Sequence, residues 1–313
     1  MDASFEKLGY FTTDARNRQT HGKFRLASRS IKCYNSTMTF FEAILLGILQ
    51  GLTEFLPVSS SGHLVLAQQF LGLKEPLVFF DVMLHVGTLA AVLVAYRGAI
   101  KRLVVGGLST LGGTQFWRQP RATLNTSTEL KFIGLILLGS IPTGIIAVLF
   151  KTELESFFDE VRLVSMMLIL TGVILQLPRL RREKADNPVG RLKTWHAPLI
   201  GIAQGCAITP GISRSGSTIS LALFLGIPGK IAAEYSFLLS IPAILGAVAL
   251  KIRDVGDTSV PLHIMGTGML ASFIVGYIAL RFLLVMLNRG KFSVFSYYCV
   301  ALGLTSLLIA LIQ

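Results

Sequence analysis

The sequence predicts an all-α integral membrane protein made of two inverted repeats, each a re-entrant helical hairpin followed by three transmembrane helices. Three observations predict it: long apolar stretches almost free of charge, a repeat between the two halves, and a break rich in proline, glycine and serine within each half. Of 313 residues, 52% are hydrophobic and only 15% are charged, whereas soluble domains carry about 25% charged residues.

Six apolar stretches approach or reach the length that a membrane span needs, roughly 20 mainly apolar residues. They are 79–96, 132–150, 163–177, 231–250, 263–287 and 292–312. Within the first of them, Asp81 and His85 are expected to pair internally or to lie near the outer interface, with a functional role as the less favoured alternative.

The formal net charge of +12 would suggest a nucleic-acid partner in a soluble protein. Here the basic residues lie between the apolar stretches, which indicates a role in membrane orientation and excludes nucleic acid as a partner. Basic residues gather in 97–131 and 179–194, so these segments are expected on the cytoplasmic side, whereas the acidic segment 151–162 is expected outside.

The N-terminal residues 1–37 differ from the rest, with seven basic and three acidic residues and little apolar periodicity. A targeting presequence would have this character, but the preferred interpretation is a disordered extension. The membrane domain is then 38–313.

An internal repeat relates the two halves, about 39–178 and 197–313. Shifting the sequence by 154 residues aligns Gly47-Ile-Leu-Gln-Gly51 with Gly201-Ile-Ala-Gln-Gly205. Ten of the 27 positions from Gly47 to Leu73 are then identical without a gap. Because three spans follow each hairpin, the second half must enter the membrane from the opposite side.

Each predicted hairpin consists of two helices too short to span the membrane, expected over 45–55 and 64–73 and over 200–209 and 218–225. The connecting segments, 56–63 and 210–216, contain proline, glycine and serine. Such irregular backbone is tolerated at membrane depth only inside protein or against a water-filled cavity. The two tips are therefore expected to meet near the midplane of the membrane.

The chemistry of the chain is concentrated at these two tips. The first carries a carboxylate, three hydroxyls and an imidazole, at Glu54, Ser59, Ser60, Ser61 and His63. The second carries Arg214 among the serines Ser213, Ser215 and Ser217. An arginine that opens a helix binds anions, because its guanidinium and the free helix amides are donors. A nucleophile and a base beside an anion clamp suit phosphoryl transfer.

These motifs resemble those of the undecaprenyl-diphosphate phosphatases, also called bacitracin resistance proteins. The resemblance rests on the strings from Gln50 to His63 and from Pro210 to Ser217, with weaker similarity in 80–88 and 233–242, and extends from about Met38 to the end. It implies a hydrolase that converts undecaprenyl diphosphate to the monophosphate, recycling the lipid carrier of peptidoglycan synthesis in the bacterial plasma membrane.

The resemblance also implies roles for single residues. Ser60 matches the nucleophile, His63 the histidine that activates it or is itself phosphorylated, and Arg214 the arginine that holds the diphosphate. Glu54 matches the main glutamate, which binds the substrate or a divalent cation, Mg²⁺ or Ca²⁺. Further predicted contacts are Gln50 to the cation and Ser59, Ser61, Ser213 and Ser215 to the substrate. For Ser59 and Ser61, satisfying backbone groups at the turn is an equal alternative. A homodimer is left open.

The motifs leave two alternatives to compare with this interpretation. Inverted repeats with broken helices also occur in transporters, and a polyprenyl-phosphate flippase would tolerate Ser60→Ala, whereas a phosphatase would not. Phosphatases of the phosphatidic-acid type also have Ser-Gly-His and Ser-Arg elements. They require a histidine and an aspartate where this chain has Ser220 and Phe224, which excludes them.

Overall fold

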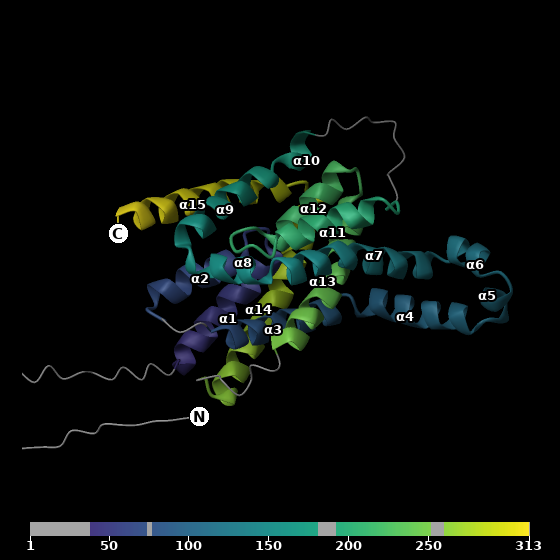
Figure 1. Cartoon of the computed structure of the whole chain (residues 1–313), viewed down its shortest axis with the longest axis horizontal. Coiled ribbons are helices and arrows are strands. Elements are labelled where there is room, and N and C mark those ends of the chain that lie inside the picture. Colours follow the sequence, from purple (N-terminus) through teal and green to yellow (C-terminus); the bar gives the residue numbers. More distant parts are fainter. Residues whose placement is uncertain (1–37, 74–76, 181–191, 252–259, 313) are drawn as a thin grey trace, which may run out of the picture. The chain divides into compact units, whose positions relative to one another are not determined.

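The computed structural model describes residues 38–73, 77–180, 192–251 and 260–312, and within them the chain is helical, without strands (Figure 1). The predicted extension, 1–37, lies outside the described residues. The helices are α1 Phe40–Phe55, α2 Ser60–Phe70, α3 Val78–Ala95, α4 Arg97–Gly112, α5 Thr114–Arg118, α6 Pro120–Thr126, α7 Thr128–Leu149, α8 Lys151–Ser156, α9 Val161–Ile174, α10 Leu177–Leu180, α11 His196–Cys206, α12 Arg214–Phe224, α13 Gly229–Lys251, α14 Leu262–Asn288 and α15 Phe295–Ile312, with short 3₁₀ helices η1 Phe157–Asp159 and η3 Phe292–Val294. The all-α prediction is confirmed.

Among the described residues, five segments are long and apolar enough to cross a membrane. They are Thr128–Leu149, Val161–Leu180, Gly229–Leu250, Leu262–Asn288 and Phe292–Ile312. A sixth candidate is the pair α3 and α4, which bend by 73° relative to each other. The predicted span 79–96 corresponds to α3. A chain with this set of helices is a multi-pass membrane protein.

Both predicted breaks between short helices are present, but the helices on either side of each break begin earlier than expected. Helix α1 begins at Phe40 because Thr39 and Glu42 form a capping box, in which each side chain accepts a backbone N–H of the other. Helix α2 begins at Ser60 because Ser59 Oγ accepts the Gly62 N–H at 3.3 Å. Such caps lie outside the apolar pattern from which helix ends were predicted.

The second break lies between α11 and α12, and the serine cap recurs there. Ser213 Oγ accepts the Gly216 N–H at 3.0 Å, so that α12 begins at Arg214 rather than at the predicted residue 218. The loop before it is tied to α9, because Thr171 Oγ1 donates to the Gly211 carbonyl at 2.7 Å and accepts the Ser213 N–H at 3.0 Å.

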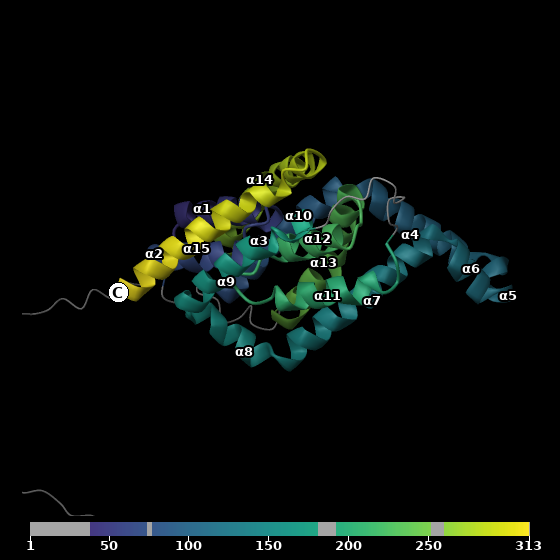
Figure 2. The same cartoon turned by 90° about the horizontal axis from the view of Figure 1, so that it is seen from above.

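Most of the basic segment 97–131, expected only as a cytoplasmic region, is helical: it contains α4, α5 and α6. Helix α4 runs beside α7, and both extend toward α5 and α6 (Figure 2). Two glycines make this approach close, since a β-carbon at Gly106 would meet the Glu129 side chain and one at Gly107 would meet Ile133. The charges of the segment did not indicate this packing, which the two small residues allow.

Each short helix that opens a half packs against a long helix of the other half: α1 against α14, and α11 against α7. Small residues line both interfaces. A β-carbon at Gly47 would clash with the Gly268 carbonyl oxygen, and one at Gly201 with the Gly139 carbonyl oxygen. Close approach through small residues is typical of helix pairs in membranes.

The last helices of the two halves, α9 and α15, lie side by side (Figure 1). A β-carbon at Gly172 would lie 3.0 Å from the Ser296 carbonyl oxygen, and one at Gly303 would lie 2.8 Å from that of Ser165. Residue numbers therefore rise along α9 in the direction in which they fall along α15, so the two helices are antiparallel.

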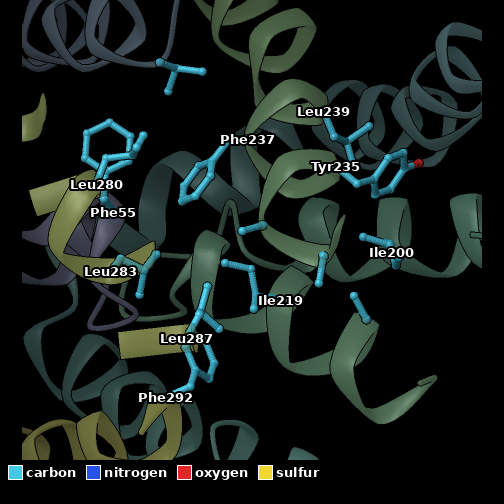
Figure 3. Packing of buried hydrophobic residues seen from close by; sticks show 14 of the residues in the cluster. Phe55, Ile200, Ile219, Tyr235, Phe237, Leu239, Leu280, Leu283, Leu287 and Phe292 are labelled. Carbon is cyan, nitrogen blue, oxygen red and sulfur yellow. The ribbon is translucent and has the colours of Figure 1, made fainter. Parts of the chain in front are cut away.

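Apolar side chains fill the space between the two breaks and the long helices. Figure 3 shows Phe237 and Tyr235 projecting from α13, with Ile219 of α12 and Leu283 of α14 nearby. Phe237 meets Phe55 edge-on, with the ring centroids 5.5 Å apart. This core supports the ends of α1 and α12, where the polar residues lie.

Candidate active site

The carboxylate of Glu54 is the centre of the polar residues at the two breaks. Its Oε1 accepts a hydrogen bond from Arg214 Nη2 at 2.6 Å, and its Oε2 accepts one from Ser60 Oγ at 2.7 Å. The Glu54 side chain is only 6% exposed and that of Arg214 16%. A buried ion pair with further hydrogen bonds is expensive to assemble, which favours a functional reason for it.

Three helix ends deliver these groups to one point. Glu54 lies in the last turn of α1, Ser60 is the first residue of α2, and Arg214 is the first residue of α12. The Arg214 guanidinium also lies over the Phe237 ring, 5.8 Å from its centroid. Two helix N-termini therefore point their partial positive charge at the site, beside a guanidinium.

Two buried atoms at this site have no hydrogen-bond partner in the described part of the chain: Arg214 Nη1, a donor, and Gln50 Oε1, an acceptor. The other end of the Gln50 amide, Nε2, donates to Glu54 Oε2 at 3.1 Å. Leaving such groups unpaired in a buried place costs free energy. A free donor on Arg214 fits an anion, and a free oxygen on Gln50 fits a cation or a donor.

The ring of His63 is held by neighbours other than Ser60. Its Nδ1 is 2.7 Å from the Ser59 carbonyl oxygen, and its Nε2 is 2.8 Å from the Tyr298 hydroxyl. Because a carbonyl only accepts, Nδ1 carries the hydrogen. The rings of His63 and Tyr298 also stack, with their centroids 5.7 Å apart and their planes 8° from parallel. In this arrangement Ser60 donates to Glu54, while α15 holds His63 through Tyr298.

Ser59 has an uncommon backbone conformation, with φ at 70°, and is the one non-glycine residue with positive φ in the described part of the chain. Residues in such conformations cost roughly 1–3 kcal/mol and cluster at functional sites. Two bonds hold the turn: the Ser59 carbonyl accepts the His63 N–H at 3.2 Å, and its hydroxyl caps α2. The next residue, Ser60, is the one that donates to Glu54.

The other predicted substrate-binding serines lie at the same two helix ends. Ser61 Oγ is 3.4 Å from Ser59 Oγ. Ser213 caps α12, and Ser215 Oγ donates to the Leu56 carbonyl at 3.4 Å, which links the two breaks. The structure therefore gives these hydroxyls local partners, and their contact with substrate stays a prediction.

His85 also reaches the site, although the sequence favoured a structural role for it over a functional one. Expected to pair internally or near the outer interface, it places Nε2 3.5 Å from Glu54 Oε2. The pattern gave a weak signal, because an ionisable residue within a span marks a functional site by default. Asp81, one turn earlier on α3, accepts a hydrogen bond from Gln68 Nε2 at 2.8 Å.

Comparison with known families matches residues 43–305 of this chain to the family described as bacitracin resistance protein BacA. The chain belongs to this family. The match includes both breaks and the residues around Glu54, so the resemblance inferred from the two motifs is confirmed.

Relatives with assigned names are similar over nearly their whole length. An undecaprenyl-diphosphatase of Desulforapulum autotrophicum is 41% identical over 277 residues, covering 87% of this chain and 98% of the relative. One of Desulfosudis oleivorans is 43% identical over 267 residues, covering 84% and 95%. One of Methanosphaera stadtmanae is 37% identical over 276 residues, covering 88% and 99%.

Proposed function

We propose that this chain is an enzyme that hydrolyses undecaprenyl diphosphate to undecaprenyl phosphate and inorganic phosphate, which recycles the lipid carrier for peptidoglycan synthesis. The names of its relatives in the BacA family support this substrate. The observation that carries the chemistry is one buried carboxylate that orients a serine hydroxyl and an arginine, each at the first position of a helix.

The diphosphate is proposed to bind between the two helix N-termini. Arg214 can hold it without leaving Glu54, because Nη2 bonds the carboxylate while Nη1 is buried and unpaired. A guanidinium presents its donors in a planar fork that suits phosphate oxygens. The free amides of α2 and α12 add further donors. Together they would neutralise charge on the transferred phosphoryl group.

Ser60 is proposed as the nucleophile. Its Oγ would form a bond to the terminal phosphorus while the bond from that phosphorus to the bridging oxygen breaks, so undecaprenyl phosphate leaves with the bonding pair. The hydroxyl proton would pass to Glu54 Oε2, which already accepts its hydrogen bond. Water would then attack the phosphoserine, releasing phosphate and restoring the hydroxyl. Phosphoryl transfer needs little removal of that proton beforehand, because its transition state is loose.

His63 is proposed either to activate Ser60 or to become phosphorylated itself, and both roles require its ring to move. Its Nε2 is engaged by the Tyr298 hydroxyl, so the imidazole must leave Tyr298 before it can receive a proton or a phosphoryl group. Until then its contribution is to hold the Ser59 turn, through Nδ1.

A divalent cation, Mg²⁺ or Ca²⁺, is proposed to assist. The donor set fits one, since Glu54 supplies a carboxylate and Gln50 a buried oxygen without a partner. Magnesium sites often have one or two carboxylates plus substrate phosphates. When bound, the cation would supply charge neutralisation to the phosphate oxygens.

The inverted-repeat architecture is also proposed, with re-entrant hairpins formed by α1 with α2 and by α11 with α12. Contacts at the breaks support it. A β-carbon at Gly62 would lie 3.1 Å from Gly211, and one at Gly216 would lie 3.3 Å from Pro57. The 154-residue shift converts one contact into the other, because it takes Gly62 to Gly216 and Pro57 to Gly211.

The α9–α15 pair supports the same symmetry. Gly172 faces Ser296 and Gly303 faces Ser165, and a shift of 131 residues exchanges the two contacts. An antiparallel pair related in this way has its two-fold axis perpendicular to the helices. For helices that cross a membrane, such an axis lies in the membrane plane, as inverted repeats require.

The site would then lie at membrane depth, where a lipid diphosphate can reach it from the bilayer. We place the enzyme in the bacterial plasma membrane. A homodimer remains a prediction, which light scattering of the detergent-purified protein would check.

The decisive experiment measures phosphate release from undecaprenyl diphosphate by the detergent-purified chain, with and without EDTA, for the wild type and Ser60→Ala. We expect release that needs both the cation and Ser60. Ser109→Ala is the matched control, since Ser109 lies on α4 and donates only to the Gly106 carbonyl; it should behave as wild type.

Each other outcome revises the proposal at a named point. Release by Ser60→Ala at the wild-type rate would move the nucleophile to His63 or to water. No release by the wild type from any polyprenyl diphosphate would contradict the phosphatase and favour a transporter or flippase.

A further inference from the structure

The imidazole of His85 reaches the site from α3, outside both breaks. Its Nδ1 is 2.8 Å from the Asp81 carbonyl oxygen, and its Nε2 is 3.5 Å from Glu54 Oε2. Because a carbonyl oxygen only accepts, Nδ1 carries the hydrogen and Nε2 faces the carboxylate. Histidines that bind metals are typically held in this manner, with the second nitrogen donating to a backbone carbonyl.

If the ring is neutral, a lone pair of Nε2 points at an oxygen of the Glu54 carboxylate. Two lone pairs that face each other repel, so a positive charge between Nε2 and Oε2 would stabilise the arrangement. This charge can be a proton or a metal ion. The unpaired, buried oxygen of Gln50 favours the metal, since a proton on His85 would leave that oxygen without a partner. The side chain of His85 is 31% exposed, so the site has an accessible side.

The spacing of groups around the Glu54 carboxylate suits a small cation. The unpaired Gln50 oxygen belongs to the amide whose Nε2 lies 3.1 Å from Glu54 Oε2, and His85 Nε2 lies 3.5 Å from the same carboxylate oxygen. Adjacent oxygen ligands about 2.1–2.4 Å from a cation lie roughly 3.0–3.4 Å apart in octahedral geometry. The two oxygens of an ionised carboxylate have about four lone pairs, of which Arg214, Ser60 and Gln50 occupy three, so Glu54 can keep these bonds and bind a cation.

We propose that His85 is a third protein ligand of the catalytic cation, beside Glu54 and Gln50. The inference rests on the proposed function, because the remaining coordination positions are for phosphate oxygens and water. Among the described residues, no three His, Cys, Asp or Glu side chains lie close enough together to hold a metal ion. The proposed site has only two such side chains, Glu54 and His85, and the amide of Gln50 is its third ligand. Mn²⁺ is a suitable probe of this site, because it shares the oxygen ligands of Mg²⁺ and Ca²⁺ and is paramagnetic.

The test is electron spin-echo spectroscopy of Mn²⁺ bound to the detergent-purified full chain without substrate. Wild-type protein should show modulation from a ¹⁴N imidazole nucleus, and labelling with [¹⁵N]histidine should replace that pattern. His85→Gln should lose the modulation and bind Mn²⁺ at least about tenfold more weakly. His63→Gln and the exposed His263→Gln are the matched controls and should keep the modulation.

Several outcomes overturn the proposal: no Mn²⁺ binding, bound Mn²⁺ without nitrogen modulation in the wild type, or modulation that disappears in His63→Gln instead. The labelling experiment uses only the wild type, so a misfolded variant cannot mask the result. Phosphate release by the same preparation is a separate measurement. An inactive protein with the nitrogen signal would contradict the proposed function alone, and an active one without it would contradict only the role of His85.

Discussion

Arg214 serves two anions from one guanidinium in the proposed mechanism: the Glu54 carboxylate through Nη2 and the substrate through Nη1. A lysine ammonium is a single point charge and cannot reproduce the planar fork. The arrangement therefore predicts that the two arms of the side chain, rather than its charge alone, determine activity.

Arg214→Ala should lower kcat/KM by roughly 10³–10⁵, the range for arginines that stabilise phosphoryl transfer. Arg214→Lys should recover only a small part of this loss. Phosphate release over a range of undecaprenyl diphosphate concentrations gives both values, with the exposed Arg118→Ala as control. Near-normal turnover by Arg214→Ala would show that the arginine is not the phosphate clamp.

Ser59 combines a positive φ with a helix cap, and two substitutions separate these properties. Ser59→Ala loses the cap, worth about 0.5–2 kcal/mol, and keeps the strained backbone. Ser59→Gly relieves the strain, and the loss of the cap costs only a few tenths of a kcal/mol when glycine replaces serine. We expect Ser59→Gly to unfold at a higher temperature than Ser59→Ala in detergent. The reverse order would mean that the turn is not strained.

At the scale of the helices, close glycine contacts hold each short helix of one half against the other half. Gly201→Ala should displace α11 from α7, because the added β-carbon would clash with the Gly139 carbonyl oxygen. We expect a lower unfolding temperature and reduced phosphate release. Gly246→Ala on α13 is the matched control, since a β-carbon there meets nothing within 4 Å, and alanine is favoured over glycine in helices. Equal behaviour of both variants would contradict the packing argument.

The sequence was sufficient to predict the helical class, most of the long helices and the two breaks, because these depend on local composition. Helix starts were predicted less well, since Ser59 and Ser213 act through hydrogen bonds rather than through apolar periodicity. The helices of the segment 97–131 were not predicted, for a related reason. Its charges suggested only an orientation signal, while its pairing of α4 with α7 depends on a tertiary contact.

The sequence repeat gave the reason to expect Glu54 and Arg214 together, although 160 residues separate them. His85 and Tyr298 have no such signal: one lies in an apolar helix and the other in a region without a motif. Their contacts with Glu54 and His63 depend on how α3 and α15 pack, which local patterns do not determine.

At the scale of the whole membrane domain, the proposed topology predicts which residues share a side of the membrane. If both hairpins are re-entrant and inverted, single cysteines at Phe40 and Phe70 should react from one side, and cysteines at Thr194 and Lys230 from the other. All four positions are exposed, and a membrane-impermeant thiol reagent on oriented vesicles, with the native cysteines replaced, reads the side. Phe40 and Phe70 on opposite sides would mean that α1 and α2 cross the membrane as one span.

The packing of α1 on α14 and of α11 on α7 also bears on how the chain can be divided. Each half lacks the long helix on which its own opening helix mainly packs. Two polypeptides made by cutting the gene between the codons for Leu180 and Leu192 should each be degraded when expressed alone. Expressed together, they should find each other in the bilayer and restore phosphatase activity, as two subunits of one enzyme.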